Sequence, residues 1–281
     1  MRRSTTSAAT DRRRVGVLLV AELICALVLV GRSHPAPARP VVAAPASVTT
    51  PTTVSTTENL DDGRTVHLAG LGGERTASLL ARIAAQMNDA AKAVTAFWGP
   101  DWPRDVLIVA AATDAEFESL ARGGPDTAAT TTAERIMFAP GAAAMSDASL
   151  RIVLRHELFH FASRADTAAD APRWLTEGVA DFVGRPPPAG PGAAELATIP
   201  TDADLDAPGP AGSGAYDRAW WFSRYVADTY GTTTLRALYL RACGPGHPDT
   251  ATAVRDTLGA DLPTVLGRWR HWMWGHLPPE G

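Results

Sequence analysis

Leu150-Arg151-Ile152-Val153-Leu154-Arg155-His156-Glu157-Leu158-Phe159-His160-Phe161 is the stretch of the sequence that decides the fold. Its apolar residues recur at the spacing of a buried helix, and Ser146 is placed to cap the start of that helix. Because residues four apart on a helix share a face, His156 and His160 can direct their imidazoles at one ion. Two histidines in this order, with a glutamate directly after the first, are typical of a zinc site with a general base. We predict His156 and His160 as zinc ligands and Glu157 as the base.

A catalytic zinc ion takes three protein ligands, so a third must come from elsewhere. Pro172 suits the first turn of a second helix. The apolar face of that helix consists of Trp174, Leu175, Val179 and Phe182. Glu177 and Asp181 lie four residues apart and share another side. We predict Glu177 as the third ligand, with Asp166, Asp170 and Asp181 as rivals, and Asp181 as the group that orients a ligand histidine through its other ring nitrogen.

These two helices resemble the gluzincin metallopeptidases, and in particular the small peptidase-MA-like proteins of bacteria. The likeness lies in His-Glu-x-x-His followed by Trp-Leu-x-Glu-Gly-x-Ala-Asp, is strongest over 150–183 and extends over 106–274. It implies that Glu177 is a ligand of one Zn²⁺ per chain, that Glu157 is the base, and that the substrate is a peptide or protein.

The sequence also departs from related families in two places. The Gly-x-Met-x-Asn motif of the related aminopeptidases is missing before the zinc helix, so exopeptidase activity is not implied. Asp166 stands where the metzincins have a third histidine. The resemblance therefore favours an endopeptidase of the gluzincin type.

The rest of the chain predicts an α+β, zincin-like fold: a small N-terminal sheet with helices, a helical C-terminal half, and the active-site cleft between them. Buried strands are expected at 106–110 and 135–139. Helices are expected at 77–98, 113–122, 216–230, 234–242, 250–258 and 262–274. By resemblance, the strand at 135–139 offers an edge that aligns the substrate backbone. The segment 185–214, rich in Pro, Gly and Ala, is expected to form a loop that walls the cleft.

Tyr216 follows this loop at the predicted start of a helix. Peptide hydrolysis builds negative charge on the carbonyl oxygen, which a phenol beside the zinc ion would stabilise. We predict Tyr216 as that donor; the alternative is a half-buried aromatic residue.

The N-terminal part of the chain has the composition of a targeting segment. Residues 1–14 are basic and would stay in the cytoplasm, and 15–31 form an apolar signal anchor or signal peptide. Residues 32–61 are rich in Pro, Thr and Ala and are expected to be a linker to the metallopeptidase domain at 62–281. We expect a bacterial single-pass membrane protein with its C-terminal domain outside, secreted if the segment is cleaved after Ala38.

The net charge, the cysteine content and two missing motifs disfavour other classes of protein. From Glu58 onward, 19 basic and 28 acidic residues leave a net charge of −9, which disfavours a nucleic-acid partner. Cys25 and Cys243 are too few for a disulfide framework. Gly-x-Ser-x-Gly and Gly-x-x-x-x-Gly-Lys are absent, which disfavours a serine hydrolase and a nucleotide-binding protein.

The function predicted from the sequence is that of an extracytoplasmic zinc-dependent peptidase. Its only membrane contact would be through the N-terminal segment. The alternative is a catalytically silent zincin-like domain that binds a partner at the cell envelope. The presence of Glu157 argues against that alternative, because a zinc site used only for binding needs no base.

Overall fold

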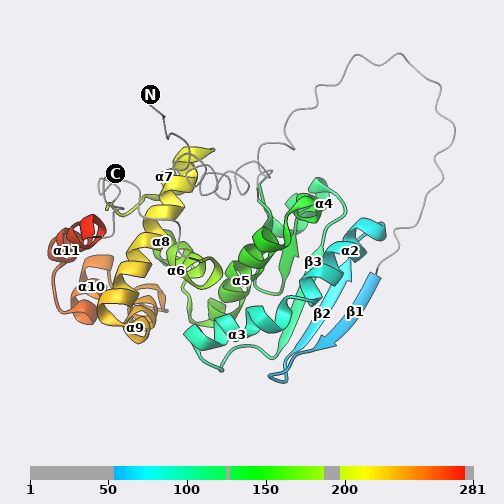
Figure 1. Ribbon diagram of the computed structural model, residues 1–281, viewed down its shortest axis with the longest axis horizontal. Coiled ribbons are helices and arrows are strands. Elements are labelled where there is room, and N and C mark those ends of the chain that lie inside the picture. Colours follow the sequence, from blue (N-terminus) through cyan, green and yellow to red (C-terminus); the bar gives the residue numbers. More distant parts are fainter. Residues whose placement is uncertain (1–53, 125–126, 187–196, 276–281) are drawn as a thin grey trace, which may run out of the picture.

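In the computed structural model, which describes residues 54–124, 127–186 and 197–275, a small sheet lies at one end of a mostly helical chain (Figure 1). Its elements are β1 (Val54–Asn59), β2 (Thr65–Gly70), α2 (Gly73–Ala84), α3 (Met87–Trp98), β3 (Asp105–Ala110), α4 (Asp114–Ala121), β4 (Ala129–Thr131), β5 (Ile136–Phe138), η1 (Pro140–Ala144), α5 (Asp147–Ser163), η2 (Arg164–Asp166), α6 (Arg173–Gly184), α7 (Asp202–Leu205), α8 (Pro210–Tyr230), α9 (Thr232–Cys243), α10 (Thr250–Leu258) and α11 (Leu262–Gly275). The predicted α+β class, with a small N-terminal sheet and a helical remainder, is confirmed.

The five strands form one sheet in the order β1-β2-β3-β5-β4. β2, β3 and β5 run parallel, and the outer strands β1 and β4 are antiparallel to their neighbours. The predicted strands at 106–110 and 135–139 correspond to β3 and β5. The edge assigned to 135–139 is wrong, however, because β5 lies between β3 and β4 and has both sides paired. Among the described residues, the outer strand on this side of the sheet is β4.

The two faces of the sheet bury different clusters, because successive side chains of a strand point to opposite faces. Ile108 and Ile136 belong to the main core, where α2 and α5 pack against the strands. Val109 and Met137 belong to a smaller cluster with Phe117 of α4. The sheet is therefore covered on both faces, and the main core continues from its α5 side into the helical half.

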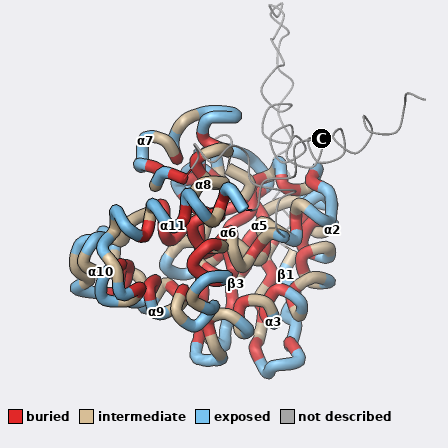
Figure 2. Tube along the Cα trace, turned by 60° about the vertical axis from the view of Figure 1, so that its left-hand side comes forward, coloured by how far each residue is buried: buried red, intermediate tan, exposed pale blue. Residues whose placement is uncertain are grey.

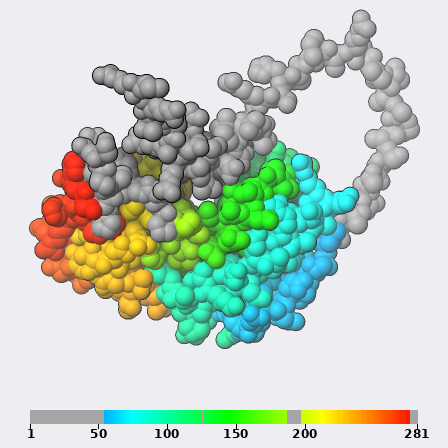
Figure 3. Space-filling model, in the orientation of Figure 1, coloured from blue at the N-terminus to red at the C-terminus, as the bar shows by residue number. Residues whose placement is uncertain are grey.

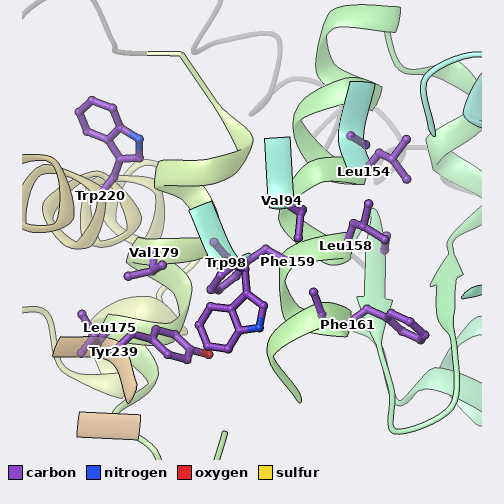
Figure 4. Packing of buried hydrophobic residues seen from close by; sticks show 14 of the residues in the cluster. Val94, Trp98, Leu154, Leu158, Phe159, Phe161, Leu175, Val179, Trp220 and Tyr239 are labelled. Atoms are coloured by element: carbon purple, nitrogen blue, oxygen red, sulfur yellow. The ribbon is translucent and has the colours of Figure 1, made fainter. Parts of the chain in front are cut away.

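An aromatic cluster joins the sheet-bearing half to the helical half. Trp98 of α3, Phe159 of α5 and Tyr239 of α9 pack edge to face, with ring centroids 5.4 to 5.7 Å apart (Figure 4). Their T-shaped arrangement is the one that aromatic quadrupoles favour. Figure 3 shows the two halves side by side, the first coloured blue to green and the second yellow to red.

α6 lies at the centre of the molecule, between α5 and α8 (Figure 2). Two glycines allow this close approach. A Cβ added at Gly178 would stand 2.5 Å from the carbonyl oxygen of Ala219 in α8. A Cβ at Gly184 would stand 3.1 Å from the carbonyl oxygen of Ile152 in α5. The helix that carries the predicted third ligand is thus packed backbone to backbone against both neighbours.

Three predicted boundaries are wrong. β1 lies within 32–61, so the end of the predicted linker is an edge strand of the sheet. The single helix expected at 77–98 is two helices, α2 and α3, and neither glycine nor proline marks the break at 85–86. The loop expected at 185–214 contains α7 and the first turn of α8.

Other predictions concern the part of the chain outside the described residues. The basic segment 1–14, the apolar segment 15–31 and the linker up to residue 53 lie there, as does 187–196 of the loop. Among the helices of the described residues, none is long and apolar enough to cross a membrane.

The packing of α6 against α8 gives a first prediction. Gly178→Ala should lower the free energy of unfolding by about 1–3 kcal/mol, the usual cost of overpacking a core, because its Cβ would meet backbone that must shift. Denaturant unfolding measures this change.

Gly214→Ala is the matched control, since it lies in α8 and an added Cβ meets no atom within 4 Å. It should be neutral or stabilising by up to about 1 kcal/mol through helix propensity. Equal stability of the Gly178→Ala variant and the native protein would contradict the close contact.

Candidate metal centre and cleft

The structure brings the three predicted zinc ligands together. His156 Nε2 lies 3.1 Å from His160 Nε2. Glu177 Oε2 lies 3.2 Å from His156 Nε2 and 3.7 Å from His160 Nε2. Within the described residues, no other three histidine, cysteine or acidic side chains converge in this way. α5 supplies both histidines one turn apart, and α6 supplies the carboxylate from the facing side.

The spacing of these atoms fits a tetrahedral zinc ion. With zinc–nitrogen distances of 2.0–2.1 Å, two ligand atoms of a tetrahedron stand about 3.3 Å apart. The three donor pairs lie close to that separation. Two imidazoles and one carboxylate are also a donor set that zinc takes in catalytic sites, where a fourth position is left for water. The residues present therefore fit zinc.

The electrostatics of the site favour a cation. Burial opposes the charged form of His156, but hydrogen bonds to Asp181 and Glu177 outweigh it and raise the pKa of His156 well above its usual value. Burial likewise opposes ionisation of Glu177, yet the two histidines hold its pKa well below the usual range. Surroundings that stabilise a positive imidazole beside an ionised carboxylate stabilise a metal cation for the same reason.

Asp181 lies where an orienting residue is expected. His156 Nδ1 donates to Asp181 Oδ1 at 2.9 Å. In a neutral imidazole the proton is then on Nδ1, and the lone pair of Nε2 is available to bind a metal ion. Arg185 lies on the far side of Asp181, with Nη2 3.2 Å from Asp181 Oδ2. Its other nitrogen, Nη1, donates to Asp217 Oδ1 at 2.7 Å.

Sequence reasoning missed Arg185 and Asp217. Arg185 follows Asp181 by four residues, and this helical spacing of opposite charges was a usable signal. Asp217 comes from α8, and no spacing along the chain connects it to the site.

Glu157 borders the same cleft and is only 8% exposed. Thr131 of β4 lies with its Oγ1 2.7 Å from Glu157 Oε2 and 2.9 Å from the Glu157 carbonyl oxygen. The hydroxyl can thus hold the carboxylate in one rotamer through Oε2. Thr131 was also missed, because a three-residue strand within a run of threonines leaves no clear pattern in the sequence.

The rival ligands lie elsewhere. Asp166 and Asp170 are not members of the converging group. Asp170 borders the cleft, and its Oδ1 lies 3.5 Å from His247 Nε2. Asp181 contacts the other ring nitrogen of His156. The geometry thus favours Glu177 among the four carboxylates considered.

Tyr216 borders the cleft from the second turn of α8, later in the helix than predicted. Arg173 Nη2 lies 3.5 Å from its hydroxyl oxygen. Burial, with the negative charge of Glu177, raises the pKa of Tyr216 to about 12. The phenol therefore keeps its proton near neutral pH, as a hydrogen-bond donor must.

The three converging side chains, Glu157, Thr131 and Tyr216 border one cleft of about 1230 Å³, above the usual range of small-molecule pockets. Its walls come from the residues just after α4, from β4 and the turn after it, from the C-terminal half of α5 with η2, from the segment 167–171, and from the first half of α6. Asp202 of α7 also borders it, so part of the predicted loop 185–214 does line the cleft. The volume suits a chain of several residues.

Comparisons with known proteins find likeness in structure alone. No family model matches the sequence, and neither does any curated protein. Among solved structures, a mutant two-domain M1 zinc metallopeptidase bound to L-arginine is 18% identical, with a TM-score of 0.47. Two mutant M1 zinc metallopeptidase structures from Deinococcus radiodurans, one bound to a Tyr-Ser-Ala substrate, are 17% identical, with TM-scores of 0.44 and 0.46. Each match covers 81% of this chain and 53% of the other, so the chain spans about half the length of these zinc metallopeptidases.

Proposed function

We propose that this protein is an extracytoplasmic zinc-dependent peptidase. The observation that carries the proposal is the convergence of His156, His160 and Glu177 in a cleft that Glu157 also lines. A metal site used only for binding has no need of an acid–base group at this position. Three protein ligands, rather than four, also leave a coordination position for water.

The roles of the residues follow from this arrangement. A bound zinc ion supplies a Lewis acid that acidifies water and polarises the scissile carbonyl. Glu157 would accept a proton from the attacking water and return it to the leaving amine. Thr131 keeps the carboxylate of Glu157 in one orientation. Asp181, held by Arg185, fixes the ring of His156.

The substrate would lie along the free edge of β4. An extended peptide can add to a sheet edge through its backbone, and β4 places Ala129, Thr130 and Thr131 on the cleft wall. The missing Gly-x-Met-x-Asn motif favours cleavage within a chain. The arginine-flanked apolar segment at 15–31 supports a location outside the cytoplasmic membrane.

Zinc content provides the first test of this function. Glu177→Ala should lose most of its zinc on dialysis, because two histidines alone leave the ion under-coordinated. Asp181→Ala should keep the ligands but weaken zinc binding by about 10–100-fold, the usual effect of removing an orienting partner. Asp170→Ala, on the same cleft wall, should bind zinc as the native protein does. Full occupancy in the Glu177→Ala variant would send the search for a third ligand to another carboxylate.

The second test concerns the base. Glu157→Gln keeps the size of the side chain but cannot accept a proton. It should retain zinc and the fold while kcat falls about 10²–10⁴-fold on casein or a peptide library. Chelator-treated native protein is the control for zinc dependence. Equal turnover by the variant and the native protein would favour the binding-domain alternative.

The third test concerns Tyr216. If its hydroxyl donates to the developing oxyanion, Tyr216→Phe should lower kcat by about 10²–10³-fold with little change in KM. Zinc content should stay unchanged, and the melting temperature should stay close to that of the native protein, because the ring still packs against the core. A plain aromatic role predicts instead an unaltered kcat for the Tyr216→Phe variant.

A further inference from the structure

Arg164 continues the line of the two histidines along the zinc helix. It directly follows α5 and keeps right-handed helical angles, with φ −55° and ψ −33°. It also follows His160 by four residues, as His160 follows His156, so the three residues share one side. Four residues advance a helix by about 6 Å. Arg164 therefore lies one turn beyond the metal centre, and it borders the same cleft.

The guanidinium of Arg164 is held in place. It stacks on the ring of Phe161, with Cζ 3.6 Å from the centroid, and Nη1 donates to the Phe161 carbonyl oxygen at 3.1 Å. Stacking fixes the plane of the guanidinium and leaves its edge available. An arginine has five N–H donors, of which two parallel ones match a carboxylate. The group is thus oriented before any ligand arrives.

Within the described residues, neither Arg164 nor Arg122, the other arginine that borders the cleft without an ion pair, has a carboxylate partner, and Arg164 differs from Arg122 in being partly buried. Arg173 pairs with Asp206, and Arg185 pairs with Asp181 and Asp217. Burial lowers the pKa of Arg164, and no acidic group counteracts it. A partly desolvated cation without a counter-charge is unfavourable, and an incoming anion would remove that cost.

The wall around Arg164 leaves space for such an anion. Its cleft-lining neighbours in the chain are small, namely Ala165, Thr167, Ala168, Ala169 and Ala171. Asp170 is the one acidic neighbour there among the described residues, and its carboxylate lies beside His247. Because these side chains are small, Arg164 is the positively charged group that a substrate would meet on this wall.

We infer that Arg164 is a specificity residue that binds a carboxylate of the substrate. The inference rests on the proposed peptidase function and names its substrate class, peptides with an acidic group near the bond that is cut. An extended chain advances about 3.3 Å per residue, which places that group one to three residues from the scissile bond. The carboxylate can come from an internal Asp or Glu or from the C-terminus of the peptide.

Direct binding separates this role from catalysis. The full-length Glu157→Gln variant, loaded with zinc, is titrated into fluorescein-labelled decapeptides of Ala, Gly and Ser with amidated C-termini. One glutamate is moved along the first set of peptides, and glutamine replaces it in the second. A further peptide has neither residue but carries a free C-terminal carboxylate, which distinguishes the two sources. Cleavage of the same peptides by the native protein, read by mass spectrometry, locates the cut relative to the glutamate.

We expect a glutamate in one register, or the free C-terminus, to bind at least about tenfold more tightly than its neutral counterpart, as a charged hydrogen-bonded pair predicts. Adding Arg164→Gln should bring this ratio close to one while the affinity for the neutral peptide is unchanged. Arg164→Lys should retain part of the preference, because it keeps the charge without the planar fork. Arg151→Gln, an exposed site on α5, should change neither affinity.

Three results would overturn the inference. The first is equal affinity for acidic and neutral peptides in every register and for the free C-terminus. The second is a preference that persists in the Arg164→Gln variant but disappears in Arg122→Gln, which would assign it to the exposed arginine after α4 that also borders the cleft. The third is an equal loss for both peptide sets, which a purely structural role of the stacked guanidinium predicts. Failure of the native protein to bind or cut any peptide would instead remove the proposed function together with the inference.

Discussion

The contact between the backbones of α5 and α6 is the constraint on which the candidate site depends. At Gly184, an added Cβ would lie 3.2 Å from the amide nitrogen of His156 itself. A larger side chain there would press on the backbone of the helix that carries both histidines, which would have to shift relative to the helix that carries Glu177. The donor atoms tolerate little separation, because zinc–ligand distances are close to 2 Å. Gly178 sets the same limit on the opposite side of α6, against α8.

Negatively and positively charged side chains alternate in a series that begins next to this contact. From the imidazole of His156, the partners are Asp181, then Arg185, then Asp217. Burial opposes the charge of Arg185, but the two carboxylates outweigh it and raise its pKa. Each member neutralises the next, which is how charged groups are tolerated away from water. His156 is thus held by a series that runs from α6 to α8, and α8 supports the candidate metal centre although it supplies none of the three converging side chains.

The sequence was most informative where a pattern is local. Helical spacing was sufficient to pair His156 with His160, to place Ser146 as the cap of α5, and to align Glu177 with Asp181 on one side of α6. A short, continuous run of apolar residues was sufficient to find β3 and β5. Thr131 and Asp217 could not be found in this way, because each reaches its partner through tertiary packing alone.

The ends of several helices and strands were predicted wrongly because they too depend on tertiary packing. β1 is polar and almost wholly exposed, so its composition is that of a linker, and only its pairing with β2 makes it a strand. The break between α2 and α3 leaves the apolar spacing intact, because both helices bury the same kinds of residue in the main core. The order of the strands is also invisible to local patterns. β5 was therefore given an edge that belongs to β4, which comes just before it in the chain.

The shortness of β4 has a consequence for recognition. A strand of three residues offers an added chain only a few backbone hydrogen bonds, and such bonds are indifferent to side-chain identity. A long edge would hold any extended polypeptide tightly and release its fragments slowly. A short edge leaves most of the discrimination to side-chain contacts and favours fast exchange of chains. It also gives other molecules little exposed backbone for uncontrolled sheet extension, a hazard of long unpaired strands.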